Sequence, residues 1–218
     1  MHWSKNLAYA VGLITTDGNL SKDGRHLSLV SKDLDQIQNF LHSIKINSKI
    51  NKRASSYTGI KKYYFVQFSN VKLYKFLISV GLHPNKTKSL QELIIPDKYF
   101  SHFLRGHLDG DGYTYSYWDK RWKSSFMFYT GFLSASKRHL EWIKEKVESL
   151  YNIHGAIKYS GKSTYHLMYA KKSSISLVSK IYQGNNNIYL KRKRFKIKRA
   201  LGIIRRRAGM LELVDRHV

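Results

Sequence analysis

Two stretches of this sequence have the same layout, and this internal repeat is the feature that most limits the possible folds. Residues 7–20 (LAYAVGLITTDGNL) and residues 103–115 (FLRGHLDGDGYTY) each contain an apolar stretch with a central glycine, then Asp-Gly, then residues typical of a strand. Their aspartates, Asp17 and Asp111, lie 94 residues apart. A period of this length indicates that one structural unit occurs twice.

The segments that follow each stretch also correspond, with apolar residues first at helical spacing and then in strand-like pairs. Each half therefore has the predicted order α-β-β-α-β-β-α, and the chain is predicted to be an α+β protein with pseudo-twofold symmetry. After the two repeated stretches we expect helices at residues 30–44, 71–81, 134–150 and 174–182, and strand pairs at residues 49–68 and 156–170.

The only two prolines, Pro84 and Pro96, lie between the two halves, which makes this stretch the natural linker. We expect an N-terminal half-domain with its linker at residues 1–95 and a C-terminal half-domain at residues 96–208. Residues 209–218 lack the basic and aromatic character of the rest, and we expect them to form a C-terminal tail.

The composition points to nucleic acid as the partner. The formal net charge is +25 and aromatic residues make up 14% of the chain, so cations for phosphates occur together with rings for sugars and bases. The charge is spread along the whole chain rather than gathered on one amphipathic helix, which disfavours a membrane surface. A structural nucleic-acid-binding protein would share this composition.

Other classes of site and location are excluded. The chain has no cysteine, so it has no disulfide and no thiolate metal site. The N-terminal apolar stretch, residues 7–14, is too short to span a membrane. We expect an intracellular protein.

Each repeated stretch is predicted to be a helix, over residues 4–17 and 100–111. Gly18 and Gly112 then follow the helix ends, where glycine is favoured because the position often needs a positive φ. An aspartate in the last turn opposes the helix dipole, so Asp17 and Asp111 cost stability unless a cation joins them. An alternative is a pair of ordinary glycine-capped helices with solvated aspartates, but two motifs at matching positions weigh against it.

Small residues allow the two helices to approach closely. In each helix, three residues spaced four positions apart form a row on one face, and all but one member of each row are small. The rows are Ala8, Gly12 and Thr16 in one helix, and His102, Gly106 and Gly110 in the other. Contact between the two central glycines would bring Asp17 and Asp111 side by side. Together with the carbonyl oxygens of Thr16 and Gly110, they would form a site of hard oxygen ligands that suits Mg²⁺ rather than zinc.

Residues 10–18 (AVGLITTDG) and 104–112 (LRGHLDGDG) resemble the paired signature helices of the LAGLIDADG homing endonucleases, and the resemblance covers nearly the whole chain. It implies two αββαββα half-domains with saddle-shaped antiparallel sheets, packed through the motif helices. It also implies a monomer, without a protein partner, that cuts both strands of a long asymmetric double-stranded DNA site. Mg²⁺ is the implied cofactor, with Mn²⁺ able to replace it and Ca²⁺ supporting binding without cleavage.

The motifs depart from the family pattern at two places. The first motif has Thr15 where the pattern often has an aspartate, whereas the second keeps Asp109. We interpret Asp109 as a helix-end or interface residue that does not bind metal directly. His107 occupies a usually apolar position, and we interpret it as a buried structural histidine.

The resemblance also implies basic residues at the active site. It places the start of the first helix after each motif at the rim, here Ser31-Lys32 and Ser136-Lys137, and a basic residue after the last helix of each half near the scissile phosphates. The catalytic lysines expected in this way are Lys32, Lys86, Lys137 and Lys191, with Lys88 and Lys193 one register away. For each of them, a surface lysine that contacts a distant phosphate is the alternative.

The strands are expected to bind DNA. A β-ribbon fits the major groove, and only the side chains of one face reach base edges. Counting in twos from each motif aspartate, and adding residues of the later strands and the basic run, the expected contacts are Arg25, His26, Asn51, Arg53, Tyr115, Tyr117, Arg121, Lys158 and Lys193.

The function expected from the resemblance is a site-specific homing endonuclease that makes a metal-dependent double-strand break by phosphodiester hydrolysis, and that acts at the DNA of the cell or organelle. Two alternatives use the same fold: a maturase that assists its intron RNA, and a DNA-binding protein without catalysis. The presence of both Asp17 and Asp111 favours the nuclease, because binding alone does not need them.

Overall fold

The computed structural model describes residues 1–54, 63–122, 125–161, 163–184 and 188–215, with side chains up to Arg207. The first half consists of α1 (Lys5–Asp17), β1 (Gly18–Leu20), β2 (His26–Ser31), α2 (Leu34–Ile44), β3 (Asn51–Arg53), β4 (Tyr63–Ser69) and α3 (Val71–Val80). The second half consists of α4 (Asp97–Asp109), β5 (Tyr113–Trp118), β6 (Phe126–Ser134), α5 (Lys137–Tyr151), β7 (Ala156–Tyr159), β8 (Tyr165–Tyr169) and α6 (Lys171–Ile181), followed by α7 (Lys191–Asp215).

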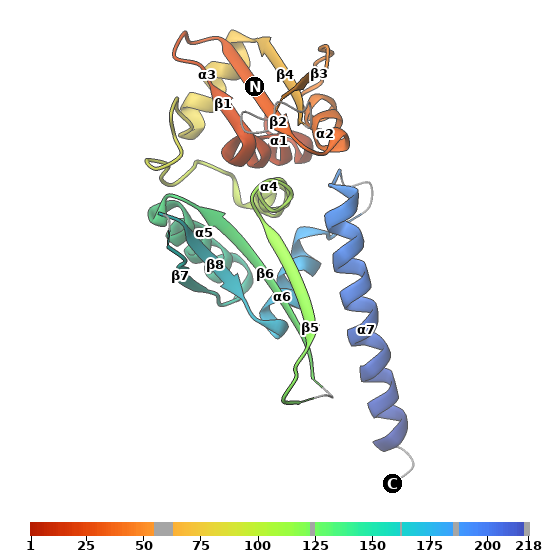
Figure 1. Cartoon of the computed structure of the whole chain (residues 1–218). Coiled ribbons are helices and arrows are strands. Elements are labelled where there is room, and N and C mark those ends of the chain that lie inside the picture. Colours follow the sequence, from red (N-terminus) through yellow and green to blue (C-terminus); the bar gives the residue numbers. More distant parts are fainter. Residues whose placement is uncertain (55–62, 123–124, 162, 185–187, 216–218) are drawn as a thin grey trace.

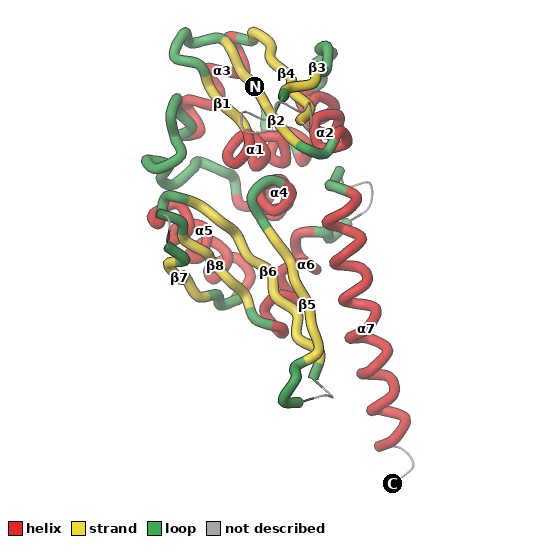
Figure 2. Tube along the Cα trace, in the orientation of Figure 1, coloured by secondary structure: helices red, strands yellow, loops and turns green. Residues whose placement is uncertain are grey.

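The two halves have the same topology. The described strands form two antiparallel four-stranded sheets with the orders β1-β2-β4-β3 and β5-β6-β8-β7. Figure 1 shows the sheets on opposite sides of α1 and α4, which pack against each other between the halves. Figure 2 shows helices against one face of each sheet. The predicted α+β fold with two repeats of αββαββα, packed through the motif helices, is confirmed.

The interface between α1 and α4 is built on glycine. A Cβ on Gly106 would lie 2.0 Å from Tyr9 O and 3.1 Å from the Cα of Gly12. A Cβ on Gly12 would lie 2.3 Å from Phe103 O. The helix backbones therefore touch, as the small-residue rows predicted, and a larger side chain at either central position would push the halves apart.

Glycine does follow both motif helices closely, but the predicted reason, a positive φ, was wrong. Gly18 has φ −90°, and Gly112 is not among the residues with positive φ. A Cβ on Gly18 would lie 2.6 Å from Ile14 Cα, and one on Gly112 would lie 2.5 Å from Leu108 Cα. Glycine is needed because the chain folds back tightly against its own helix. The second helix also ends earlier than expected, at Asp109.

A pair of histidines lies buried beneath the second motif. His139 Nδ1 lies 2.9 Å from Gln91 O, which can only accept, so Nδ1 carries the proton and Nε2 is an acceptor. His107 Nε2, 3.2 Å from His139 Nε2, must then be the donor. Both imidazoles are neutral in this arrangement, and the interpretation of His107 as a buried structural residue agrees with it.

Helix α7 has no counterpart in the described part of the first half. It packs against β5, and Arg207 stacks over the Trp118 ring with 5.2 Å between guanidinium carbon and ring centroid. Trp118 in turn meets Phe126 edge to face. The side of the β5–β6 hairpin that carries these two residues is therefore covered by α7. The tail expected at residues 209–218 begins inside this helix.

Within the described residues, every helix is too short or too polar to cross a bilayer.

Candidate active site

The two motif aspartates lie at one end of the paired helices. Asp17 is the last residue of α1, and Asp111 follows the end of α4 by two residues. The Asp17 carboxylate reaches the other half, because its Oδ2 lies 3.1 Å from the point where a Cβ on Gly110 would stand. The glycine contact between the helices thus brings the two motif ends together.

Both carboxylates are destabilised as anions. Burial and the negative charge of Asp111 raise the pKa of Asp17 to about 6, although a hydrogen bond from Gln36 acts in the opposite direction. Gln36 Nε2 donates to Asp17 Oδ2 at 2.6 Å. Burial also raises the pKa of Asp111, against the effect of Lys193 and Lys86. A bound cation would relieve this cost.

Each half supplies one lysine ammonium group, buried in the case of Lys86 and partly buried in the case of Lys193. Lys86 Nζ donates to the carbonyl oxygen of Gly18, next to the first motif aspartate. Lys193 Nζ donates to three carbonyl oxygens around the end of α4, those of Leu108 (2.7 Å), Gly110 (2.6 Å) and Gly112 (2.7 Å). Burial lowers the pKa of both lysines to about 8, although Asp17 and Asp111 act to raise it. The lysines hold the backbone on which the aspartates stand.

The structure changes the expected register of the second lysine. Lys191 is exposed at the start of α7, and its backbone N–H donates to Asp35 Oδ2 at 3.2 Å. Lys193, which we expected to contact DNA away from the cleavage site, instead lies beside the end of the second motif. Lys193 rather than Lys191 is therefore the counterpart of Lys86.

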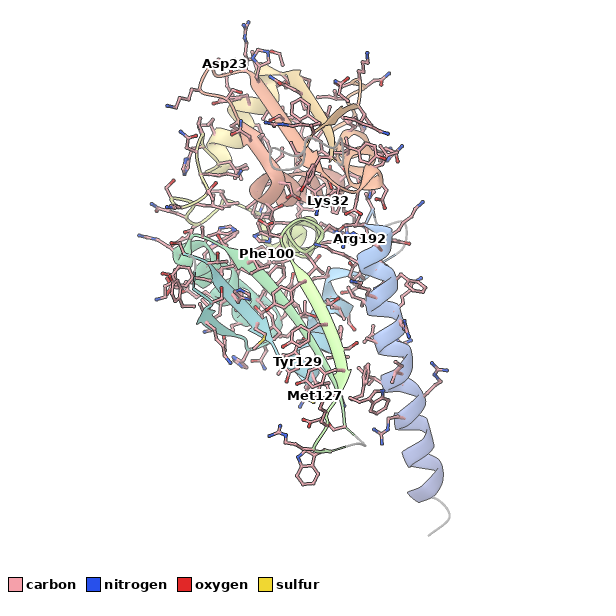
Figure 3. All side chains as sticks on the ribbon, in the orientation of Figure 1. Asp23, Lys32, Phe100, Met127, Tyr129 and Arg192 are labelled. Atoms are coloured by element: carbon pink, nitrogen blue, oxygen red, sulfur yellow. The ribbon has the colours of Figure 1, made fainter. Side chains whose placement is uncertain are left out.

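Only one of the two rim lysines is close to the carboxylates. Lys32 lines a hollow of about 380 Å³ together with Asp17, Gly110 and Arg192. Figure 3 shows Lys32 and Arg192 near the central helix pair. Lys137 instead forms an ion pair with Glu141 at 2.8 Å and lies outside this hollow.

The pairing of Ser31-Lys32 with Ser136-Lys137 was wrong because the repeats are offset there. Ser31 Oγ accepts a hydrogen bond from the N–H two residues later, and Ser134 Oγ does the same in the second half. Ser134 is thus the counterpart of Ser31, and an alanine stands opposite Lys32. By the same alignment His139 corresponds to Gln36.

Gln36 is a site residue that we did not predict. It lies in the first turn of α2 and is buried between Asp17 and Ser31 Oγ, which donates to Gln36 Oε1 at 3.0 Å. The signal that could have found it is its polarity on an otherwise apolar helix face, between Ile37 and the helix start. Arg192 was missed because it stands in a long basic run.

The other acidic residue of the second motif is structural. Asp109 is 1% exposed, and its Oδ2 accepts from Tyr9 Oη at 2.8 Å and from Leu190 N at 2.7 Å. Its counterpart Thr15 donates to Val11 O at 2.7 Å within its own helix. Our interpretation of Asp109 as an interface residue agrees with these contacts.

The site suits a cation with hard oxygen ligands, although its side-chain ligands are few. Within the ranges that the structure describes, no three His, Asp or Glu side chains gather to hold a metal ion. Asp17 and Asp111 would need further oxygens from water, backbone or a bound phosphate, a set that Mg²⁺ accepts. The carbonyl of Gly110 already accepts from Lys193, while the Thr16 hydroxyl donates to Leu13 O at 3.0 Å within α1. The roles of the Thr16 and Gly110 carbonyls as metal ligands stay predictions.

The outer face of each sheet, defined here as the face turned away from the buried core residues, carries most of the expected DNA contacts. In the first half, Leu27, Leu29 and Val66 face the core, so the alternating residues face outward. The expected residues on this outer face are His26, Asn51 and Arg53, and the register adds Asn19, Ser28 and Gln67, which we did not predict.

The outer face of the second sheet is aromatic. Tyr115 stacks on Tyr129 across the strands with centroids 4.9 Å apart, and Tyr117 stacks at 6.2 Å from Tyr115. Figure 3 shows Tyr129 on this hairpin. The Tyr113 ring lies against Gly131, where a Cβ would come within 2.4 Å of it. Lys158 shares this face, opposite His166.

The two arginines expected to contact DNA lie in the β1–β2 and β5–β6 turns. Arg25 is exposed, and its backbone N–H donates to Asp23 Oδ1 at 3.1 Å. Arg121 is exposed and forms an ion pair with Asp119 at 3.3 Å. Both can therefore extend the outer faces of the sheets toward a ligand.

Comparisons of the fold identify known proteins of the same architecture. The homing endonuclease I-WcaI, bound to its DNA recognition sequence, is 16% identical, with a TM-score of 0.61 over 90% of this chain and 87% of that chain. Mesophilic variants of the homing endonuclease I-DmoI are 17% identical, with a TM-score of 0.56 over 86% and 96%. The N-terminal LAGLIDADG domain of DUF199/WhiA, not described as an endonuclease, is 16% identical, with a TM-score of 0.57 over 84% and 85%.

Structures of I-DmoI in complex with DNA and Mn, and with DNA and Ca, and of a variant of it with target DNA in the presence of Mg, are each 17% identical to this chain. No family model and no curated protein matches the sequence. The agreement covers both halves, both four-stranded sheets and the paired central helices. The chain therefore has the two-repeat LAGLIDADG fold, with one signature motif in each half.

Proposed function

We propose that this protein is a site-specific DNA endonuclease that uses a divalent metal ion to break both strands of an asymmetric target. The observation that carries the proposal is the pair of aspartates, Asp17 and Asp111, brought together at one end of the helix interface, each beside a lysine whose ammonium group binds backbone carbonyls. Holding two carboxylates so close together that their pKa values rise costs stability, so the arrangement needs a functional reason. Binding alone would not need it.

The target is proposed to lie across the outer faces of the two sheets. A formal net charge of +25 provides the attraction for phosphates. The first face offers amide, hydroxyl, imidazole and guanidinium groups that can read base edges, and the second offers stacked tyrosines. Because the two faces differ, we expect an asymmetric double-stranded site bound by one copy of the chain.

Asp17 and Asp111 are the residues that would hold Mg²⁺. When bound, the ion would activate water and stabilise the charge that develops on the phosphate oxygens. Lys86 and Lys193 hold the backbone at the motif ends and keep a positive charge close to both carboxylates. Lys32 lines the hollow beside Asp17, where its ammonium group would bind a phosphate group of the entering strand.

The I-DmoI complexes with DNA and Mn, Mg or Ca support the choice of a divalent ion. The alternatives, an RNA maturase and a DNA-binding protein without catalysis, remain as outcomes of the test. No observation at the described residues favours either over the nuclease.

The test uses duplex DNA that spans the insertion locus of the gene with the element removed. The protein is incubated with this DNA in Mg²⁺ and in Ca²⁺, as wild type and as Asp111→Asn. We expect double-strand cleavage at one position in Mg²⁺, loss of cleavage in the variant, and binding by both proteins in Ca²⁺. Tight binding without cleavage in any metal would reject the nuclease, and the intron RNA would be the next ligand tested.

A further inference from the structure

The start of α7 is held by the first half of the molecule. Arg192 Nε donates to both carboxylate oxygens of Asp33 at 2.8 Å. The backbone N–H of Lys191 donates to Asp35 Oδ2 at 3.2 Å. One turn further along α2, Asn39 Nδ2 donates to the carbonyl of residue 189 at 2.9 Å. Three side chains of α2 and the residue before it thus bind three of the four residues 189–192.

Residues of the second half also bind the segment at the start of α7. Leu190 N donates to the buried carboxylate of Asp109 at 2.7 Å, and Arg105 Nε donates to Ile188 O at 2.8 Å. Carboxylates at the N-terminus of a helix satisfy its free N–H groups and match the positive end of its dipole. Asp109 and Asp35 therefore hold the first backbone N–H groups of α7 at the interface.

Lys193 depends on this anchor. It is the third residue of α7, and its ammonium group reaches the carbonyls of Gly110 and Gly112 only if the first turn of the helix is in place. Lys86 has no such dependence. It lies in a turn of its own half, where its carbonyl accepts from Ser89 N at 3.1 Å and Leu90 N at 2.8 Å. The two lysines are alike in position but differ in what holds them.

We propose that Asp33 is a positioning residue which, through Arg192, sets Lys193 against the second motif, so that the first half of the chain controls the cleavage of one DNA strand. The proposal rests on the endonuclease function proposed above. The Arg192 side chain is 53% exposed, so its ion pair with Asp33 contributes little to stability, but the contact of one guanidinium with both carboxylate oxygens fixes direction. We therefore expect loss of Asp33 to change the placement of Lys193 and not the stability of the fold.

The first experiment measures each strand separately. The duplex carries a different label on each strand and is cleaved in a single turnover at saturating protein, by wild type, Asp33→Asn, Asp33→Glu and Glu141→Gln. Glu141 forms an exposed ion pair away from α7, so its variant has the same change of charge and serves as the control. We expect Asp33→Asn to slow one strand by about tenfold, which corresponds to a barrier increase of about 1.4 kcal/mol.

The other strand should keep its rate within about twofold, so nicked DNA accumulates, and Asp33→Glu should restore the slow strand because it keeps the carboxylate. Equal slowing of both strands would overturn the proposal, as would no slowing of either. A wild-type protein that cleaves neither strand would instead reject the proposed function.

The second experiment needs no DNA and separates the two proposals. An amine-acylating reagent labels the free protein, and mass spectrometry follows Lys193 and Lys86, both largely buried and hydrogen-bonded to carbonyls. Asp33→Asn should increase the labelling rate of Lys193 by about fivefold or more, because its ammonium group would leave the carbonyls more often. The labelling rate of Lys86 should stay within about twofold. An unchanged Lys193, or an equal rise at Lys86, would contradict the role of Asp33 whether or not the protein cleaves DNA.

Discussion

Gly12 and Gly106 face each other across the two halves, so closely that a Cβ on Gly106 would lie 3.1 Å from the Cα of Gly12 and 2.0 Å from Tyr9 O. Neither backbone can retreat without moving a whole half-domain. Gly106→Ala should therefore lower the free energy of unfolding by about 3 kcal/mol, as overpacking of a core does. Urea unfolding measures it.

Gly202→Ala is the matched control for this substitution. Gly202 also lies within a helix, but a Cβ there would meet nothing within 4 Å. Because alanine favours helix over glycine, this variant should gain about 0.5–1 kcal/mol. If both variants lost stability to the same extent, helix propensity and not the interface contact would be the cause.

The Asp17 carboxylate should lower the free energy of unfolding although cleavage requires it. The pKa of Asp17 is raised to about 6 in the folded protein, so its ionised form at pH 7.5 opposes folding. In the absence of divalent metal, Asp17→Asn should increase the free energy of unfolding at pH 7.5 by about 1–2 kcal/mol, while cleavage is lost. The gain should vanish as pH falls below the ordinary pKa of the carboxyl, about 4, where wild type is also neutral.

Adding Mg²⁺ should stabilise the wild type and leave Asp17→Asn almost unchanged, since the ion would bind through the two carboxylates. Calorimetric melting with and without Mg²⁺ tests both points. A variant less stable than wild type without metal would show that the Asp17 carboxylate is not under strain.

The register of the second lysine gives a third prediction. Lys193→Met should reduce single-turnover cleavage by about 100-fold on at least one strand, because removing one positioned charge near reacting groups costs about 2.7 kcal/mol or more. Lys191→Met removes the same charge two residues earlier, from an exposed position, and should change the rate less than about threefold. The reverse order of effects would restore Lys191 as the active-site lysine.

The buried histidine pair predicts loss of stability in acid. Burial lowers the pKa of His139 to about 4, and burial together with the neighbouring His139 lowers the pKa of His107 well below its ordinary value. The unfolded chain binds protons at about pH 6.5, so the free energy of unfolding should fall as pH drops from 6.5 toward 4, by up to about 3 kcal/mol from His139 and by a further loss from His107.

His139→Gln should flatten this pH dependence, because an amide can donate to Gln91 O and accept from His107 without titrating. The first half has Gln36 at the equivalent position, so the substitution fits the fold. His2→Gln, at an exposed position, is the control and should keep the slope of the wild type. Unfolding monitored by circular dichroism between pH 4.5 and pH 7.5 compares the three proteins.

The outer face of the first sheet predicts base-specific contacts. Gln67 is exposed in the centre of this face, whereas Lys52 in the neighbouring strand lies on the opposite face. Gln67→Ala should weaken binding to the target by about 1–3 kcal/mol and leave binding to random duplex unchanged. Lys52→Ala should affect both DNAs alike and weakly. If Gln67→Ala weakened binding to the target and to random duplex by the same amount, this face would not read the bases.

Much of the fold could be predicted because it is repeated. One motif alone is a common turn signal, but two with the same helices and strands behind them define a twofold architecture. The contact of Gly12 with Gly106 followed from spacing alone, since residues four apart share one face of a helix. The Asp-Gly repeat pointed to Asp17 and Asp111, and the resemblance to the signature motifs, rather than helix spacing, set Asp109 aside; the metal-binding role of the two aspartates stays a prediction.

The lysines show where counting along the chain fails. Lys86 was found because only one short turn separates it from its helix. Lys191 and Lys137 were chosen by matching short basic or Ser-Lys patterns, and an offset of two residues moved each away from the site. Insertions in one repeat change the spacing along the sequence but keep equivalent hydrogen bonds. Ser134 and Lys193 could therefore be recognised as the counterparts of Ser31 and Lys86 only from their contacts.

The anchor of α7 has a consequence for how such a chain can change. The two halves repeat one topology, yet Lys193 takes its position from Asp33, in the other half. A hybrid that joined residues 96–218 to a foreign first half would inherit both motif helices and still lack the carboxylate that orients its second lysine. Recombination between relatives would therefore preserve the fold more readily than it preserved matched cutting of the two strands.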